Sequence, residues 1–150
     1  MNDLIAINDL TSALLRSVAP DARRTLLRQI ARDIRKSQSD RIARQVQPDG
    51  QPFAPRKATG GKARKGRLRD RVMFKRLRLA KFLKAGAEPG EAWVGFAGRA
   101  AAIARVHQEG LNDVPARGAK KVRYAQRILL GLTDAEQDMI LDRLLSAVAP

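Results

Sequence analysis

The sequence contains no cysteine among its 150 residues. Disulfide bonds, thiolate metal sites and a cysteine nucleophile are therefore excluded. Long apolar runs are missing too: no stretch approaches the ~18 apolar residues of a membrane-spanning helix, and no basic segment precedes an apolar one at the N-terminus. We expect a soluble protein that is made and kept in the cytoplasm, without membrane contact.

Aromatic residues are also scarce. They make up 4% of the chain, against 44% for hydrophobic residues as a whole, and all six lie after residue 52. The core is therefore expected to be mainly aliphatic, with β or irregular structure in the middle of the chain and helices at its ends. The length fits a single domain over residues 1–150. Its expected parts are a helical N-terminal part (1–47), a flexible basic arm (56–71) and an α+β part (72–150).

Constellations of catalytic or metal-binding residues are lacking as well. His107 is the single histidine, and the nearest acid, Glu109, lies two positions along and on a different helix face. A general base needs an orienting partner, and a zinc site needs three or four ligands. His107 is therefore interpreted as a structural residue. Gly60-Gly61-Lys62 lacks the rest of a phosphate-loop motif and is interpreted as a linker. We expect no enzyme activity, no cofactor and no metal.

Positive charge is what the sequence has in excess. Of the formal net charge of +15, +12 lies between Arg56 and Lys84, where thirteen Lys and Arg residues accompany one acid, Asp70. Charge of that density calls for an anionic surface nearby. Apolar residues return from Val72 onward, so residues 72–84 are expected to belong to the fold, as helix or strand, with their charges on its surface.

The basic arm has almost no apolar residues over positions 56–71. Such a segment cannot bury enough surface to offset its ordering entropy, and we expect it to be disordered in the free protein. Three interpretations stay open: a solvated arm, a contact with nucleic acid, and a protein interface that orders on assembly. The candidate residues are Arg56, Lys57, Lys62, Arg64, Lys65, Arg67, Arg69 and Arg71.

Helical periodicity is clearest at the two ends of the chain. Apolar residues recur with helical spacing over 2–18 and over 21–46, before Pro48-Asp49-Gly50 ends the second helix. Ser37-Gln38-Ser39 interrupts this second stripe, so the far half of the helix either packs on its own domain or leaves the core to reach a partner. Thr133 and Glu136 predict a capping box for a last helix over 133–148. Its acids are interpreted as a solvated face: Asp134, Glu136, Asp138 and Asp142.

The middle of the chain predicts a hairpin and a short helix. Residues 81–87 and 91–97 flank Pro89-Gly90 as a β-hairpin, and a helix over 99–108 ends at Gly110. Residues 122–130 are expected to run back into the core as an extended segment. Phe53, between two prolines, lies in extended backbone, and its ring either packs in its own core or plugs a groove. The expected fold class is α+β, with N-terminal helices and a C-terminal helix packed on a small antiparallel sheet and a flexible basic loop.

Six short segments in a fixed order carry a resemblance to a known family. They are 39–43 (SDRIA), 47–57 (QPDGQPFAPRK), 73–78 (MFKRLR), 94–99 (VGFAGR), 103–110 (IARVHQEG) and 123–133, which begins RYA and ends LGLT. Their order and spacing resemble the virion morphogenesis or tail completion proteins of contractile-tailed phages and Mu-like prophages, over nearly the whole chain. Where relatives are expected to have Tyr-Pro, this chain has Tyr124-Ala125.

The resemblance implies a structural, non-enzymatic role late in tail assembly, in which the protein caps or completes the tail so that it joins the DNA-filled head. The implied partners are other phage tail and neck proteins and further copies of the chain, in a ring that tail symmetry makes a hexamer. The implied location is the virion tail or neck, after assembly in the host cytoplasm. The alternative is a basic protein that contacts DNA without sequence specificity. The motif residues expected to have structural roles are Asp49, Gly50, Phe53, Gly95, Phe96, His107, Gly110, Tyr124 and Gly131.

Overall fold

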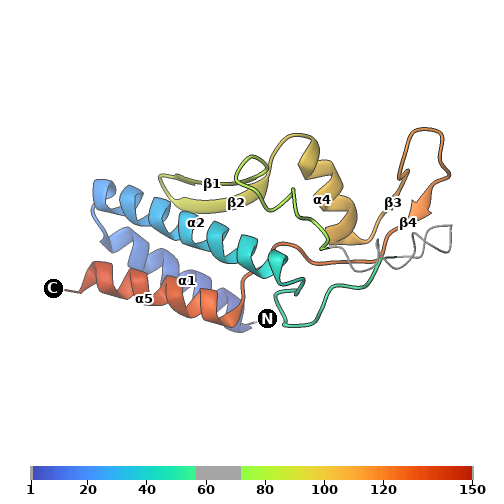
Figure 1. Cartoon of the computed structure of the whole chain (residues 1–150). Coiled ribbons are helices and arrows are strands. Elements are labelled where there is room, and N and C mark those ends of the chain that lie inside the picture. The colour runs from blue at the N-terminus through green and yellow to red at the C-terminus, as the bar shows by residue number, and fades with distance from the viewer. Residues whose placement is uncertain (1, 57–71, 150) are drawn as a thin grey trace. The chain divides into compact units, whose positions relative to one another are not determined.

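The computed structural model describes residues 2–56 and 72–149, with side chains from residue 8 onward. Its elements are, in chain order, the helices α1 (Asn2–Ser17) and α2 (Pro20–Ala43), the strands β1 (Leu83–Glu88) and β2 (Glu91–Phe96), the helix α4 (Arg99–Glu109), the short strands β3 (Asn112–Asp113) and β4 (Val122–Arg123), and the helix α5 (Asp134–Val148) (Figure 1). This arrangement confirms the α+β class. Within the described ranges, no helix is long and apolar enough to cross a membrane.

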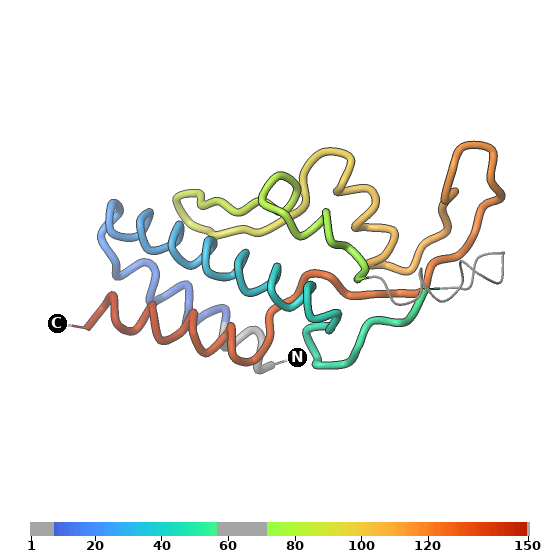
Figure 2. Tube along the Cα trace, in the orientation of Figure 1, coloured from blue at the N-terminus to red at the C-terminus, as the bar shows by residue number. Residues whose placement is uncertain are grey.

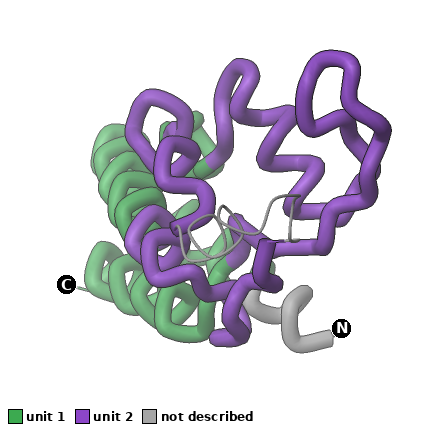
Figure 3. Tube along the Cα trace, turned by 45° about the vertical axis from the view of Figure 1, so that its right-hand side comes forward, with its two compact units in different colours: residues 1–37, 85–94, 132–150 green, residues 38–84, 95–131 purple. Residues whose placement is uncertain are grey.

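The chain divides into two compact units that alternate along the sequence (Figure 3). Unit 1 contains residues 1–37, 85–94 and 132–150, and unit 2 contains residues 38–84 and 95–131. The chain passes from one unit to the other inside α2 and inside both strands of the β1–β2 hairpin. That the whole chain forms one domain stays a prediction.

Unit 1 is built on helices that pair their apolar faces. Leu26, Ile30 and Ile34 follow one another at four-residue spacing along α2 and form a buried core with Leu144 of α5. Side chains from α1, β2 and α5 pack against this core: Leu14, Leu15, Ala92, Val94, Met139 and Ile140. Helices α1 and α5 lie side by side (Figure 2).

The capping box at the start of α5 is formed as the sequence predicts. The Glu136 backbone N–H donates to Thr133 Oγ1 at 3.1 Å, and the Thr133 N–H donates to Glu136 Oε2 at 2.9 Å. The interpretation of Glu136 as part of a solvated face is wrong, because its side chain is buried and its Oε1 accepts a hydrogen bond of 2.6 Å from the Ser37 hydroxyl. Asp134, Asp138 and Asp142 are exposed, as expected.

Unit 2 has a separate core that contains most of the aromatic residues. Ile42, Phe53 and Leu129 are central, with Met73, Leu77, Ala100 and Ala104, and the rings of Phe74, Phe82 and Phe96 pack against them. Phe53 therefore packs in its own core rather than plugging a groove. The return segment also reaches this core, because Leu129 is fully buried. Only Val122–Arg123 of that segment forms a strand, in antiparallel register with Asn112–Asp113.

Residues 72–82 form turns, and both expected conformations, helix and strand, are wrong for them. The reason is that side chains of Ser39 in α2 and of Gln45 in the turn after it bond to the backbone of this segment. Gln45 accepts from the Met73 N–H at 2.8 Å and donates to the Met73 carbonyl at 2.9 Å, and the Ser39 hydroxyl donates to the Arg78 carbonyl at 3.0 Å. The apolar side chains of Met73 and Leu77 are buried here, as the sequence predicts.

Candidate interaction site

A row of four rings in edge-to-face contact lies in unit 2 and brings together three of the motif residues, Phe53, His107 and Tyr124. Phe53 meets Phe74 at a ring distance of 5.5 Å, Phe74 meets His107 at 4.8 Å, and His107 meets Tyr124 at 5.0 Å, each in an edge-to-face arrangement. Contacts of this geometry add about 0.5–1.5 kcal/mol each beyond their buried area. Phe74, which adopts a positive φ of 63°, is the residue through which Phe53 and His107 are linked.

His107 is neutral in this environment. Burial, followed by the charges of Arg127 and Arg56, lowers its pKa from 6.5 to about 4, against a smaller opposing effect of Asp113. Arg127 Nη1 lies 3.3 Å from His107 Nδ1. Because a guanidinium only donates, Nδ1 must be the acceptor, and the ring proton is then on Nε2. His107 is therefore held as a structural hydrogen-bond acceptor.

Arg127 is a buried arginine that ties three segments of unit 2 together. Its Nε donates to the Ala54 carbonyl at 2.6 Å and its Nη2 to the Pro55 carbonyl at 2.9 Å, while its backbone N–H donates to the His107 carbonyl at 2.8 Å. Only 4% of the residue is exposed. Burial, and then the nearby Arg56, lower the pKa of its guanidinium. Sequence reasoning missed Arg127, and no local pattern distinguishes it from the chain's many other arginines.

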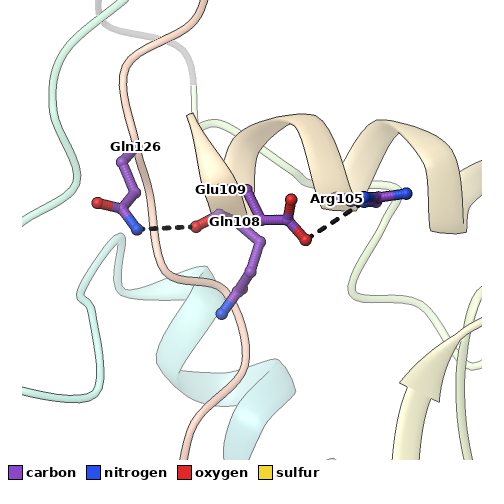
Figure 4. Close-up of polar contacts among 4 residues, drawn as sticks. All are labelled: Arg105, Gln108, Glu109 and Gln126. Carbon is purple, nitrogen blue, oxygen red and sulfur yellow. Dashed lines mark hydrogen bonds and ion pairs between the residues drawn. The ribbon is translucent and has the colours of Figure 1, made fainter. Parts of the chain in front are cut away.

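Gln108, beside His107, supports the irregular segment that follows β4. Its Oε1 accepts from the N–H groups of Leu129 and Leu130 at 2.7 and 3.0 Å, and its Nε2 donates to the Leu130 carbonyl at 3.0 Å. The Gln108 carbonyl accepts from Gln126 Nε2 at 3.2 Å, as Figure 4 shows beside the exposed Arg105–Glu109 pair. The paired donor and acceptor of a glutamine side chain thus replace a strand partner for this stretch of backbone.

The structure explains some of the motif glycines by the lack of room or the backbone conformation at their positions, but not all of them. Gly110 ends α4 with φ of 65°, and a Cβ there would meet the Gln126 backbone N at 3.2 Å. A Cβ on Gly131 would approach the Pro48 ring to 2.8 Å. Gly50 adopts φ of 87° in the turn where Asp49 Oδ1 accepts from the Gln51 N–H at 2.9 Å. At Gly95 nothing lies within 4 Å of an added Cβ, so packing does not explain that glycine.

The far half of α2 is held inside unit 2 by a second polar network. Gln38, 2% exposed, donates from Nε2 to the Gly131 carbonyl at 2.8 Å and accepts from the Gly131 N–H at 3.2 Å. Arg41 donates to Gln38 Oε1, to the Leu129 carbonyl at 2.6 Å and to the Val46 carbonyl at 2.9 Å. Of the two alternatives for this half of the helix, packing on its own chain is therefore the one observed. The polar break in the apolar stripe marks a buried network.

A pocket of about 840 Å³ lies beside the row of rings in unit 2. Its apolar lining includes Val72, Ile103 and Val122, each of which is between 38% and 49% exposed. Its basic lining consists of Arg56, Lys75, Arg76, Arg123 and Arg127. We call this feature the basic pocket. Its apolar lining and its concentration of cations suit an anionic partner that also carries apolar side chains.

Of the candidate basic arm, only Arg56 lies within the described residues, where it lines the basic pocket. The others, Lys57, Lys62, Arg64, Lys65, Arg67, Arg69 and Arg71, lie outside them, as does Gly60-Gly61-Lys62. The role of the arm stays a prediction. Among the described residues, no three His, Cys, Asp or Glu side chains are grouped as a metal site requires.

The chain matches known proteins over almost its whole length. The model of the phage virion morphogenesis family matches residues 2–149. Tail completion protein S of Escherichia phage P2 is 36% identical to the chain over 147 residues, which are 97% of this chain and 97% of that protein. No solved structure matches. The match covers both units, including the basic pocket and the row of rings.

Proposed function

This chain belongs to the phage virion morphogenesis family, as its sequence segments predict, and we propose from this that it is a structural protein of tail completion. The observation that carries the proposal is the similarity to tail completion protein S of phage P2 over 97% of both chains. Similarity at that coverage leaves no large segment of either chain without a counterpart.

The chemistry of unit 2 supports a structural rather than an enzymatic role. His107 and Arg127, two groups that often act in catalysis, both use their polar atoms to hold the chain together. A neutral imidazole whose Nδ1 already accepts a hydrogen bond is a poor general base at that atom.

At finer detail, we propose that the protein caps or completes the tail and supports its joining to the head. Its partners are then other tail and neck proteins and further copies of itself, and its place is the tail or neck of the virion. Contractile tails have sixfold symmetry, so a protein that closes their end is best accommodated as a hexameric ring of identical contacts.

The test is the composition of particles made without this gene. We expect separate tails and DNA-filled heads that fail to join, and joined virions again when the wild-type gene is supplied in trans. Normal numbers of joined virions from the deletion mutant would overturn the proposal.

A second function, DNA contact without sequence specificity, is favoured by one observation. The charge of +12 between Arg56 and Lys84 suits the phosphate backbone of packaged DNA. If this is the main role, affinity for duplex DNA falls by orders of magnitude between low and moderate salt, and neutralising Arg64, Lys65, Arg67 and Arg69 flattens that dependence. Binding that does not respond to salt would exclude it.

A further inference from the structure

The exposed face of α5 combines acidic and apolar side chains. Asp134, Asp138 and Asp142 are spaced four residues apart, so they form one row along the helix. Leu145 follows Asp142 by three residues and lies on the same face, where it is 50% exposed. In the described part of the chain, these three carboxylates form no ion pair. We call this surface the acidic face of α5.

The opposite sides of α5 are already occupied within unit 1. Leu144 is buried in the core with Leu26, Ile30 and Ile34, and Glu136 is used in the capping box. Arg143, which lines a hollow beside α2 together with Asp138 and Asp142, pairs with Asp33 of α2. The acidic face is thus the side of the helix that the unit 1 core does not use.

The basic pocket of unit 2 has the complementary chemistry. Lys75 and Arg76 line it and are exposed, as is Arg123 of β4, and Val72 and Ile103 add exposed apolar side chains to the same lining. An amphipathic helix with carboxylates in a row and a leucine beside them can place the leucine on the apolar lining while its carboxylates meet the cations.

We propose that the basic pocket of one copy binds the acidic face of α5 of a second copy. The inference rests on the proposed function, since it names the contact through which copies of a tail completion protein would associate. The net charge of +15 makes copies repel one another in most orientations. Contact between an acidic face and a basic pocket replaces this repulsion by attraction at that place. The net positive charge therefore disfavours other orientations of two copies relative to this one.

This contact joins two different surfaces of the chain, and it is heterologous when each copy gives its pocket to one neighbour and its α5 to another. Each copy keeps a free pocket or a free α5 after the first contact, so association continues until a ring closes. The charged pairs lie at the surface and are screened by salt, while Leu145 contributes apolar area that salt does not weaken. We therefore expect association that is reduced, but not abolished, at high ionic strength.

The experiment breaks each surface separately in the full-length chain. Asp138→Lys with Asp142→Lys reverses the helix side, and Lys75→Glu with Arg76→Glu reverses the pocket side. All four residues are exposed, so folding is spared. Masses are measured by light scattering across a concentration series. We expect the wild type to form oligomers, and each variant alone to show an association constant at least about tenfold weaker, since opposed like charges cost several kcal/mol.

Mixing the two variants distinguishes this contact from other kinds of association. The helix-side variant keeps an intact pocket and the pocket-side variant keeps an intact helix, so one wild-type contact is available in the mixture. The two reversed surfaces are also opposite in charge and so do not repel each other. We expect the mixture to associate more strongly than either variant alone, beginning with a heterodimer of twice the 16.5 kDa monomer mass. A symmetric interface, in which the same patch meets itself, would give no such rescue. A mixture that stays monomeric, or a wild type that is monomeric at every soluble concentration, would overturn the proposal.

Matched controls carry the same charge changes elsewhere. Glu88→Lys with Glu91→Lys adds the same charge on the exposed β1–β2 turn, and Arg24→Glu with Arg28→Glu removes it on the exposed side of α2. Both are expected to associate as the wild type does. If a control weakens association as strongly as its matched variant, net charge rather than the named contact is responsible, and the proposal fails.

The same variants also separate this proposal from the proposed function when they are tested for rescue of the deletion mutant. If the pocket-side variant alone fails to yield joined virions, the pocket serves an acidic segment of another protein and the self-contact is wrong, while the role in tail completion stands. If only the pocket-side variant loses duplex DNA binding and both variants assemble normally, phosphate is its occupant and the self-contact is likewise wrong. If the deletion mutant itself yields joined virions, the proposed function fails first.

Discussion

The His107 ring, packed between Phe74 and Tyr124, accepts a hydrogen bond that a protonated imidazole cannot accept. Its neutral state is therefore part of the structure of unit 2. Arg127 supplies that hydrogen bond and closes two more on the carbonyls of Ala54 and Pro55. At the scale of single residues, side chains such as Arg127 donate hydrogen bonds to backbone carbonyls of unit 2 that lie outside its strands.

The pH dependence of stability follows from the lowered pKa of His107. The unfolded chain binds this proton below pH 6.5 and the folded chain only below about pH 4, so acidification through that window favours unfolding. The contribution is fully present above pH 6.5 and is lost as the pH falls. We expect the urea midpoint of the wild type to fall more steeply between pH 7 and pH 4 than that of His107→Phe, which keeps a ring but does not titrate. Parallel curves would contradict this assignment.

Arg127→Lys tests the fork geometry of the guanidinium. A lysine keeps the charge but cannot bond Ala54, Pro55 and His107 together, so buried carbonyls lose their donors at a cost of about 1–3 kcal/mol. Arg105→Lys is the matched control, since Arg105 is exposed and pairs with Glu109 at the surface. Its effect is expected to stay below about 0.5 kcal/mol. Chemical denaturation measures both. Equal changes in the free energy of unfolding would show that the hydrogen bonds of the Arg127 guanidinium do not stabilise the fold more than an exposed ion pair does.

The motif glycines give a second pair of substitutions. Gly110→Ala places a Cβ in a left-handed conformation and 3.2 Å from the Gln126 backbone, and we expect a loss of about 1–3 kcal/mol. Gly95→Ala meets nothing within 4 Å in a strand, where glycine itself is unfavourable, so stability is expected to be unchanged or slightly raised. Thermal unfolding of the two variants compares them directly. A more harmful change at Gly95 would mean that this position serves a contact outside the chain.

At the scale of elements, α2 changes character along its length. Its first half presents Leu26, Ile30 and Ile34 to an apolar core, and its second half presents Gln38 and Arg41 to backbone carbonyls. A helix whose apolar stripe turns polar would ordinarily be read as emerging into solvent. Here the polar residues are buried, and the segment over 129–131, which is not itself a strand, takes hydrogen bonds from their side chains.

Gln38→Met tests this second half of α2. The methionine fills a similar volume but removes the side-chain partners of the Gly131 backbone and one of the acceptors of Arg41 in a buried site, at an expected cost of about 2–3 kcal/mol. Gln29→Met, at an exposed position of the same helix, is the control and is expected to change stability by less than about 0.5 kcal/mol. The shift in urea midpoint of each variant is the measurement. A tolerated Gln38→Met would show that the network is dispensable.

At the scale of the whole molecule, the two units interleave in sequence. Neither unit is a continuous stretch of chain, and α2, β1 and β2 each contribute residues to both. Excising one unit without cutting the other is therefore impossible. This supports the proposal that residues 1–150 fold as one domain.

A single unfolding transition is the corresponding prediction. Trp93 lies in unit 1 and Tyr124 in unit 2, so tryptophan fluorescence and tyrosine absorbance report on different units. We expect their urea curves to coincide, and Leu129→Ala, which empties a fully buried site in unit 2, to shift both curves together by about 2–5 kcal/mol. Two separated midpoints would instead show two domains.

Local sequence signals determined the helices, the hairpin and the family. Apolar spacing, the Thr133–Glu136 capping box and Pro89-Gly90 act within a few residues, so they can be recognised without knowing what lies across the fold. The segments around Phe53 and His107 were recognisable for the same reason. Tertiary structure alone decided which polar side chains are buried. Gln38 bonds Gly131 and Arg127 bonds Pro55, partners that are 93 and 72 residues away. Backbone groups in an irregular segment still need hydrogen-bond partners, and here the tertiary fold supplies them from side chains that are distant in the sequence.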